Sequence, residues 1–483
     1  MCFRDLTAPR LHGIPRSVID RHVEAFFAYV YPIQANAIVH RGTLMREITD
    51  GRVARKVLLA ICAAAARFVD HMQASGAPVA VRGSMAAKAW ATEAKTTLLT
   101  EDPSLDSITA ALILAKEDIS SGRFSQAFTL AAVAMRMALA MRLHQELPPD
   151  DEKSISERET RRRLMWGCFS LDRMMSTGVP EFLITPVQSL RIRLPCDDQR
   201  YLYGMAVETP IPALESAGDS NDRDPAKFEG VGILGHHLRL QGVRTMILYV
   251  SRNREPSDLP PWDPSGAFVA AERKIQAWYD SLSPQFHLTP ETVYARKAQN
   301  ELTPLIMIHI WYHMNLVELY RMAMPGFPES LEPAISSTAP HGWTDRNRDQ
   351  CVHHARMIAN TLRHVSSLVD LDTMIFGDSS LPICVYESVR ARLQYAFLLP
   401  LAPQAAELAE LAADVEVMFS FLMRMSRYFS NARWLVSVIP VFCLSGRKAD
   451  AFIAPRDASH APAPRTGWKC ALGHVWCSES ERG

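Results

Sequence analysis

The sequence predicts an all-α protein with an irregular multi-helix fold. Apolar residues recur at intervals of three and four positions along most of the 483 residues. Alanine, leucine and methionine, which are good helix formers, fill these runs. Alternating β-branched segments, which would indicate strands, are scarce. Since 48% of the residues are hydrophobic and 22% are charged, the composition is that of an ordinary globular protein, with one large core or a few smaller ones.

The first half of the chain should contain a series of helices separated by short breaks. They are expected at residues 21–31, 53–68, 85–99, 107–115, 124–143 and 161–175. Ser156 and Glu159 have the spacing of a capping box and predict a helix start just before residue 161. Gly178 and Pro180 then predict the end of that helix.

Helical periodicity resumes beyond a polar segment at 217–227, which we interpret as an exposed linker. Further helices are expected at residues 231–251, 266–282, 305–321, 349–369, 382–399, 405–429 and 434–444. The predicted domain organisation is an N-terminal lead-in (1–19), a helical region (20–204), a linker (205–227), a second helical half (228–444) and a tail (445–483). The tail is rich in Ala, Pro, Arg and Ser and is expected to be disordered.

The charge balance disfavours a protein that holds DNA by itself. Lys and Arg number 52, as do Asp and Glu, so the formal net charge is zero, whereas direct DNA binding usually brings a basic excess. The nine cysteines are scattered, which is typical of a reducing compartment. The longest uncharged apolar run, 57–66, is about half of the ~20 residues that a membrane helix needs. We therefore expect a soluble intracellular protein whose partners are proteins or small molecules, with no direct DNA binding and no membrane.

The most specific block of the sequence lies between residues 122 and 198. It begins with GRFSQAFTLAAVAMRMALAMRLHQE at 122–146. After an acidic gap it continues with SERETRRRLMWGCFSLDRMMSTGVPEFLITPVQSLRIRLPCDD at 156–198. The order is therefore a helix ending in Arg-Leu-His, an acidic gap, an arginine-rich helix start, a short loop and a final Leu-Pro-x-Asp-Asp.

Five other stretches precede or follow this block along the chain. They are HVEAFFAYVYP (22–32), HRGTLMREI (40–48), KVLLAICAAAARF (56–68), KIQAWYDSLSPQF (274–286) and HIWYHMNLVELYR (309–321). Together the stretches resemble, over roughly residues 20 to 440, the middle homology region of fungal zinc binuclear cluster transcription factors, including the xylanolytic activators. The positions that match the family motif are Arg142, His144, Glu159, Arg162, Arg163, Trp166, Asp172, Arg173, Pro195 and Asp198.

The resemblance implies a nuclear transcription regulator rather than an enzyme. Its helical region would bind protein partners in transcription, among them a DNA-bound regulator, or sense a small-molecule effector. A second interpretation keeps the fold but makes the chain a helical protein-interaction scaffold with no role in transcription.

The sequence departs from the family at the DNA-binding module. That module needs six cysteines, with two Cys-x-x-Cys pairs, to bridge two zinc ions. No Cys-x-x-Cys occurs in this sequence, and only Cys2 precedes residue 62. We therefore expect no zinc cluster and no cofactor in this chain, which would act through a partner or be a truncated product that lacks an upstream exon.

Four arginines crowd the start of the 161–175 helix: Arg158, Arg161, Arg162 and Arg163. They admit a nuclear-import or DNA-contact interpretation, but we expect them to pair with Glu157, Glu159 and nearby carboxylates. At the far end of the helix, Asp172 and Arg173 could close an ion pair across the following loop, and we expect Asp172 and one of the four arginines to be buried partners.

Six methionines accompany this block: Met135, Met137, Met141, Met165, Met174 and Met175. Methionine adapts both to irregular cores and to promiscuous binding surfaces. The methionines therefore suggest either a pocket for an apolar effector or plain core packing, and we favour core packing.

Two patterns imitate catalytic or cofactor motifs. Gly230, Gly232 and Gly235 have the spacing of a dinucleotide loop, but a polar segment precedes them where the motif needs a strand. His309 and His313 have the spacing of a zinc protease, yet Ile310 stands where that motif needs glutamate. We therefore expect neither activity, and no nucleophile elbow or phosphate-binding P-loop occurs in the sequence.

Two further patterns could bind metals. The tail residues Cys470, His474 and Cys477 supply three zinc ligands where a structural site needs four. Asp150-Asp151 and Asn221-Asp222 with Glu229 resemble the magnesium motifs of all-α prenyl-diphosphate enzymes. Because Ser154 and Pro225 replace motif residues there, this enzyme is the least favoured alternative.

Overall fold

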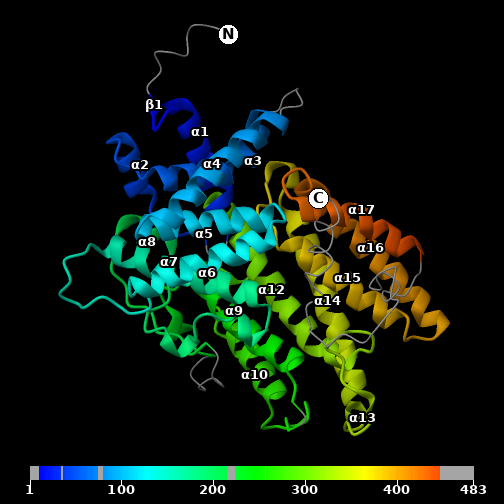
Figure 1. Cartoon of the computed structure of the whole chain (residues 1–483). Helices are drawn as coiled ribbons and strands as arrows, with labels where there is room; N and C mark the ends of the chain where they lie inside the picture. Colours follow the sequence, from blue (N-terminus) through cyan, green and yellow to red (C-terminus); the bar gives the residue numbers. More distant parts are fainter. Residues whose placement is uncertain (1–9, 34–35, 74–79, 215–222, 256, 446–483) are drawn as a thin grey trace, which may run out of the picture.

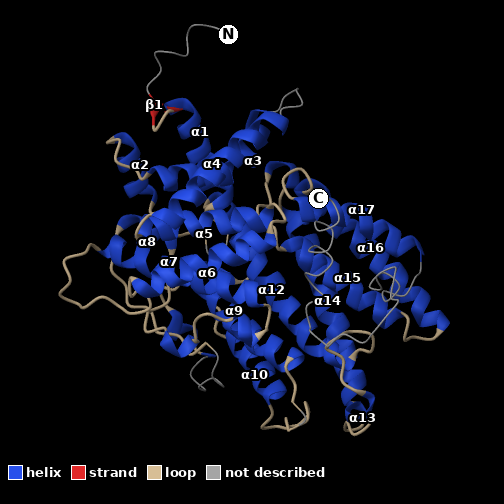
Figure 2. Cartoon of the chain, viewed as in Figure 1, coloured by secondary structure: helices blue, strands red, loops and turns tan. Residues whose placement is uncertain are grey.

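The computed structural model describes residues 10–33, 36–73, 80–214, 223–255 and 257–445. The fold is all-α, as predicted. Helices form nearly all of the ordered elements (Figures 1 and 2). The one sheet in these residues is a short antiparallel pair, β1 (Arg10–Leu11) with β2 (Ile14–Pro15).

The helices of the first half are α1 (Arg16–Ala25), the π-helical turn η2 (Phe26–Val30), α2 (Arg41–Thr49), α3 (Arg55–Gln73), α4 (Ala80–Thr100), α5 (Leu105–Ser120), α6 (Phe124–Ala140), α7 (Ile155–Ser176) and α8 (Asp198–Tyr203). Those of the second half are α9 (Ile233–Arg252), α10 (Ala267–Asp280), α11 (Pro290–Ala298), α12 (Leu302–Tyr320), α13 (Pro333–Ser336), α14 (Trp343–Leu368), α15 (Leu381–Ala396), α16 (Leu401–Met425) and α17 (Ser430–Ser445).

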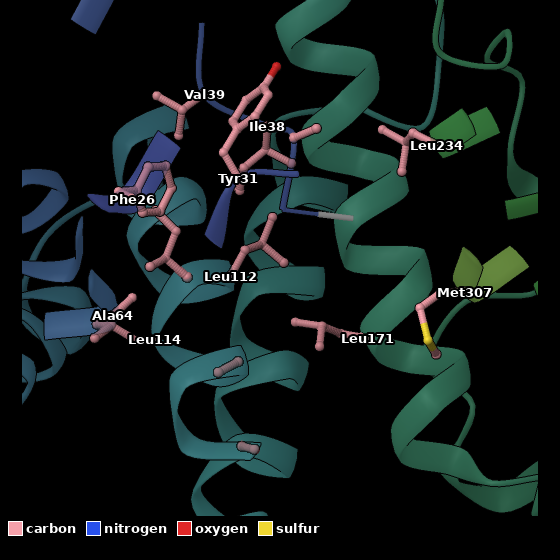
Figure 3. Packing of buried hydrophobic residues seen from close by; sticks show 14 of the residues in the cluster. Phe26, Tyr31, Ile38, Val39, Ala64, Leu112, Leu114, Leu171, Leu234 and Met307 are labelled. Carbon is pink, nitrogen blue, oxygen red and sulfur yellow. The ribbon is translucent and has the colours of Figure 1, made fainter. Parts of the chain in front are cut away.

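The helices of both halves pack against one another. In Figure 1, α1–α4 lie above α5–α7, α9 lies below them, and α14–α17 lie to the right. Helix α7 contacts α9, and α12 contacts α9, α14 and α15. The larger hydrophobic cluster accordingly contains residues from Ile14 to Leu435. Figure 3 shows Leu112 of α5, Leu171 of α7 and Met307 of α12 within it.

A second cluster lies within the second half. It joins α9, α10, α12 and α14 through aromatic side chains such as Trp278 and Tyr312, whose rings stack with their centroids 5.9 Å apart. The first half and the second half therefore share one core, and the second half adds another.

The structure can be compared with several of the predicted domain boundaries. Helix α1 begins at Arg16, inside the predicted lead-in. Leu214, in the predicted linker, is buried, and its Cβ would lie 2.9 Å from a Cβ added to Gly242 of α9. Residues 215–222 and the tail from 446 onward lie outside the described residues, so the domain boundaries stay predictions.

The start of α7 differs from the prediction. Its capping box is formed by Ser154 and Glu157, each two positions before the predicted Ser156 and Glu159. Both pairs have the same spacing, but Glu159 is 1% exposed and is engaged in the core instead. The capping role therefore falls to the exposed Glu157, whose carboxylate accepts from the Ser154 N–H at 2.9 Å.

Helix α6 ends earlier than expected, at Ala140 rather than at residue 143. Arg142 adopts a left-handed conformation with φ of 55°, and the Leu143 N–H donates to the Ala138 carbonyl at 2.9 Å. This is the geometry of a left-handed helix C-cap, which turns the chain away from the helix axis.

Among the described residues, no helix is both long enough and apolar enough to cross a membrane.

Candidate functional site

The arginine-rich start of α7 forms a buried polar network centred on Arg163, which is 0% exposed. Its guanidinium pairs with Glu159 at 3.0 Å and with Asp198, at the start of α8, at 2.6 Å. It also donates to the carbonyls of Ala37 at 2.9 Å and Cys196 at 2.8 Å. One side chain on α7 therefore links three segments that are far apart in the sequence.

Aromatic and electrostatic contacts reinforce this position. The Cζ of Arg163 lies 4.0 Å from the centroid of the Tyr201 ring, within cation–π range. Burial alone would lower the pKa of Arg163, but Asp198, Tyr31 and Glu159 hold this pKa well above its usual range. The guanidinium is thus a permanent charge whose counter-charges lie beside it.

Arg162 extends the network to the loop after α6. It binds Glu146 through two nitrogens, at 2.7 and 3.0 Å, and Glu159 at 3.0 Å. Glu146 also accepts from the Arg193 N–H at 2.8 Å, and the indole of Trp166 donates to the Arg193 carbonyl at 2.8 Å. Glu159 in turn accepts from the Cys196 N–H at 3.0 Å. The segment 191–198 is therefore held against α7 along two of its turns.

The remaining two arginines of this group bind main-chain carbonyls. Arg158 donates to the carbonyls of Pro148 at 2.8 Å and Asp151 at 2.7 Å, and Arg161 donates to Met141 at 3.3 Å. The expectation that all four arginines pair with carboxylates is therefore wrong for Arg158, which donates to carbonyls of the 147–153 loop. The main-chain carbonyls of this loop need hydrogen-bond donors, and the long side chain of Arg158 reaches them from α7.

Asp172 and Arg173 form a separate pair at the far end of α7. Both are buried, and they meet at 2.8 Å. Asp172 also accepts from the Ile184 N–H at 3.1 Å, while Arg173 donates to the Thr185 carbonyl at 3.0 Å. The pair thus fastens the loop that follows α7. The buried arginine partner of Asp172 is therefore its neighbour Arg173, and the expectation that it would be one of the four arginines at the start of α7 is wrong.

The other motif residues lie around this network rather than in it. Arg142 is exposed at the end of α6, and the carbonyl of His144 accepts from the Arg191 N–H at 2.8 Å. The Pro195 carbonyl would lie 3.2 Å from a Cβ on Gly235. The structure therefore brings together Glu159, Arg162, Arg163, Trp166 and Asp198, and leaves Arg142 outside.

The glycine pattern at 230–235 has a packing explanation. A Cβ on Gly232 would lie 2.7 Å from the Cα of Asp197, and one on Gly235 would lie 2.4 Å from a methyl carbon of Val231. A short 3-10 helix, Pro225–Phe228, precedes the pattern in place of a strand. The glycines allow the start of α9 to pack closely against residues 195–198, and the described chain around them has no βαβ unit.

The candidate metal ligands do not converge. His309 Nε2 lies 2.8 Å from the Phe286 carbonyl, whereas His313 Nδ1 lies 3.0 Å from His354 Nδ1. Asp151 accepts from the Lys153 N–H at 2.9 Å. Within the described residues, no three His, Cys, Asp or Glu side chains are placed to hold a metal ion. Asp150 and Glu229 belong to the described residues, whereas the candidates Asn221, Asp222, Cys470, His474 and Cys477 lie outside them.

Two hollows lie next to these elements. A cleft of about 700 Å³ is bordered by polar side chains of α2, α8, α11 and the residues before α12, including Arg41, Asp198, Arg296 and Glu301. A smaller cavity of about 210 Å³ lies between the two halves, and its lining includes Phe68, Met174, Gln241, Trp311 and Asn315.

The sequence did not reveal the smaller cavity, because its lining comes from segments spread between residues 29 and 431. Of the six methionines in the matched block, only Met174 lines it. Met135 and Met165 are fully buried, and Met137 and Met175 are also buried, as core packing requires.

Comparison with known proteins finds a family domain within the first half of the chain and distant relatives. Residues 23–210 match the family described as the fungal specific transcription factor domain. The chain is 24% identical, over 88% of its length, to the Zn(2)-C6 fungal-type transcription factors FTF1c and FTF1a of Fusarium oxysporum f. sp. lycopersici, of which it covers 45% and 39%. It is 25% identical over 66% of its length to an uncharacterized transcriptional regulatory protein of Schizosaccharomyces pombe, of which it covers 50%.

The chain thus spans less than half the length of the two Fusarium relatives. No solved structure matches it. The family is one of transcription factors and not of enzymes. The chain carries the fungal-specific transcription factor domain at residues 23–210 and is a distant homologue of the Zn(2)-C6 fungal transcription factors.

Proposed function

We propose that this chain is the helical regulatory body of a nuclear transcription regulator and carries no chemistry of its own. The observation that carries the proposal is the match to the transcription factor domain over residues 23–210, which includes the whole Arg163 network. In this proposal, Arg163 and its partners serve as structural residues, which fix the segments 37–39 and 191–201 against α7.

Regulation in this proposal works through contacts with other molecules. The two halves share one hydrophobic core, so a small effector bound between them would change the packing of both. The surface that results would recruit or release a protein partner in transcription.

In this proposal the DNA contact comes from elsewhere, since the 483 residues contain no Cys-x-x-Cys pair for a zinc cluster. A DNA-bound partner protein, or a zinc-cluster segment encoded upstream of Met1, would supply it. The genomic sequence upstream of Met1 separates these two routes, since an in-frame Cys-x-x-Cys exon would favour the second.

A tethered reporter assay tests the proposal. The chain is fused to a heterologous DNA-binding module, and reporter output is measured across growth conditions. Two variants accompany the wild type: Arg163→Met, which disrupts the buried network, and Arg136→Met, which removes an exposed arginine from α6. We expect the wild type and Arg136→Met to change reporter output equally and Arg163→Met to lose the effect.

A reporter that never responds to the tethered wild-type chain contradicts the proposal. Co-purification of the same chain with proteins unconnected to transcription would then support the scaffold interpretation instead.

A further inference from the structure

The 210 Å³ cavity lies at the junction of the two halves. The first half contributes Phe68 of α3 and Met174 of α7, whereas the second half contributes Gln241 of α9 and both Trp311 and Asn315 of α12. A molecule held here contacts both halves at once. The inference below rests on the proposed function, because it assigns a chemical class to the effector.

Two amide side chains in the cavity wall are oriented by the protein. Gln241 donates through Nε2 to the Ser170 carbonyl at 2.9 Å, and Asn315 accepts through Oδ1 from Arg244 at 3.1 Å. Their other ends, Gln241 Oε1 and Asn315 Nδ2, are buried and have no hydrogen-bond partner among the described residues. Asn315 is 0% exposed. The wall therefore presents one acceptor and one donor whose hydrogen bonds the rest of the described protein does not make.

His237, on the turn of α9 before Gln241, is a third polar group in the wall. It is 7% exposed, and within the described chain its Nδ1 also has no hydrogen-bond partner. Burial and the neighbouring Lys116 lower the pKa of His237 to about 3. The imidazole is therefore neutral near pH 7, like the two amides.

The arginines around the cavity already have carboxylate partners. Arg244 binds Glu318 through two nitrogens, one of them at 3.0 Å. Arg67 pairs with Glu117 at 2.5 Å. Arg252 pairs with Glu329 at 3.3 Å, and the Asp378 carboxylate accepts from Ser380. An ionic ligand would lose its hydration here and face arginines that are already paired with carboxylates, so the cavity disfavours it.

The rest of the wall is apolar and the space is small. Phe68, Met174, Leu240, Trp311 and Phe429 supply rings and aliphatic groups. A dry cavity of ~150 Å³ holds a benzene molecule, so 210 Å³ has room for a ring system slightly larger than one ring.

We propose that this cavity binds a neutral, flat, mostly apolar molecule that carries one carbonyl acceptor and one N–H or O–H donor, such as an aromatic lactam. The carbonyl accepts from Asn315 Nδ2, and the N–H or O–H donates to Gln241 Oε1. The ring system packs between Phe68, Met174 and Trp311.

Calorimetric titration of the purified full chain tests this assignment with three probes of similar size. 2-Quinolone has the lactam carbonyl and N–H, naphthalene has neither, and 2-naphthoate adds a negative charge. We expect 2-quinolone to bind at least tenfold more tightly than naphthalene and 2-naphthoate to show no binding. This comparison uses the wild-type chain alone and does not depend on how any variant folds.

Variants then locate the site. Gln241→Met and Asn315→Leu remove the acceptor and the donor with little change of volume, and each should weaken 2-quinolone binding about tenfold. Gln276→Leu, which replaces an exposed glutamine on α10, is the matched control and should bind like the wild type. Circular dichroism of each variant verifies its helix content before titration.

The assignment is overturned if 2-naphthoate or naphthalene binds as well as 2-quinolone, or if folded Gln241→Met and Asn315→Leu bind 2-quinolone with unchanged affinity. 2-Quinolone binding that follows the expected pattern, with no response in the tethered reporter, supports the cavity assignment and counts against the effector role in the proposed function.

Discussion

Replacement of Arg163 by methionine removes the centre of the buried network while keeping an unbranched side chain of similar length. The change deletes ion pairs to Glu159 and Asp198 and two hydrogen bonds to carbonyls. Breaking a buried ion pair from one side typically costs about 3–5 kcal/mol, because the remaining charge and acceptors stay buried without a partner. A folded domain is usually stable by only ~5–15 kcal/mol. We therefore expect Arg163→Met to lose a large part of the free energy of unfolding.

Urea denaturation followed by far-ultraviolet circular dichroism measures this loss. Arg136→Met is the matched control, and since Arg136 is exposed its free energy of unfolding should stay within about 0.5 kcal/mol of the wild type. The double variant Arg163→Met, Glu159→Met should lose less than the sum of the two single variants, because it removes both buried charges together. An Arg163→Met protein that unfolds within about 0.5 kcal/mol of the wild type would refute the structural role of this network.

Two further predictions concern the packing of α9 and the buried histidines. Gly232→Ala places a Cβ 2.7 Å from the Cα of Asp197, so it should lower the free energy of unfolding by about 1–3 kcal/mol, whereas Gly42→Ala, which meets only a histidine side chain, should cost less in the same denaturation assay. A Gly232→Ala variant with the free energy of unfolding of the wild type would contradict the packing explanation of the glycine pattern. Burial lowers the pKa of His237 to about 3 and of His309 to about 4, below the ordinary value of 6.5. Below pH 6.5 these histidines are therefore protonated in the unfolded chain but stay neutral in the folded protein. The free energy of unfolding present at neutral pH should then fall as the pH drops from 6.5 towards 4. The expected loss is about 1 kcal/mol per histidine over the first pH unit. Denaturation midpoints measured at several pH values should show this fall, His309→Gln should reduce it, and a midpoint that rises on acidification would contradict the burial of these neutral histidines.

The long helices could be predicted from the sequence because periodicity and helix propensity agree along them. Helices α5, α6, α7, α9, α12, α14 and α16 all overlap their predicted ranges. The short helices α8 and α11 were not expected, since six or nine residues are too few to show a period. Their caps offered the available signal, with Asp197 before α8 and Thr289-Pro290 at the start of α11.

Less of the candidate sites than of the helices could be predicted from the sequence. Ser154 with Glu157 and Ser156 with Glu159 match the same capping pattern, and only the tertiary environment of Glu159 separates them. The cavity is less predictable still, because Gln241 and Asn315 become neighbours of one space only when α9 packs on α12. The ion pair of Asp172 with Arg173 was suggested by their adjacency and the following loop, but the sequence did not show that Arg173, rather than an arginine at the start of α7, is the buried partner of Asp172.

Chromatin immunoprecipitation of the tagged, full-length chain, expressed from its own promoter, tests the central claim most directly. If the chain is a regulatory body that reaches DNA through a partner or an upstream zinc cluster, it should be enriched at a defined set of promoters relative to an untagged strain. Recovery of promoter DNA at the level of the untagged strain, in every growth condition where the protein is present, would contradict the claim.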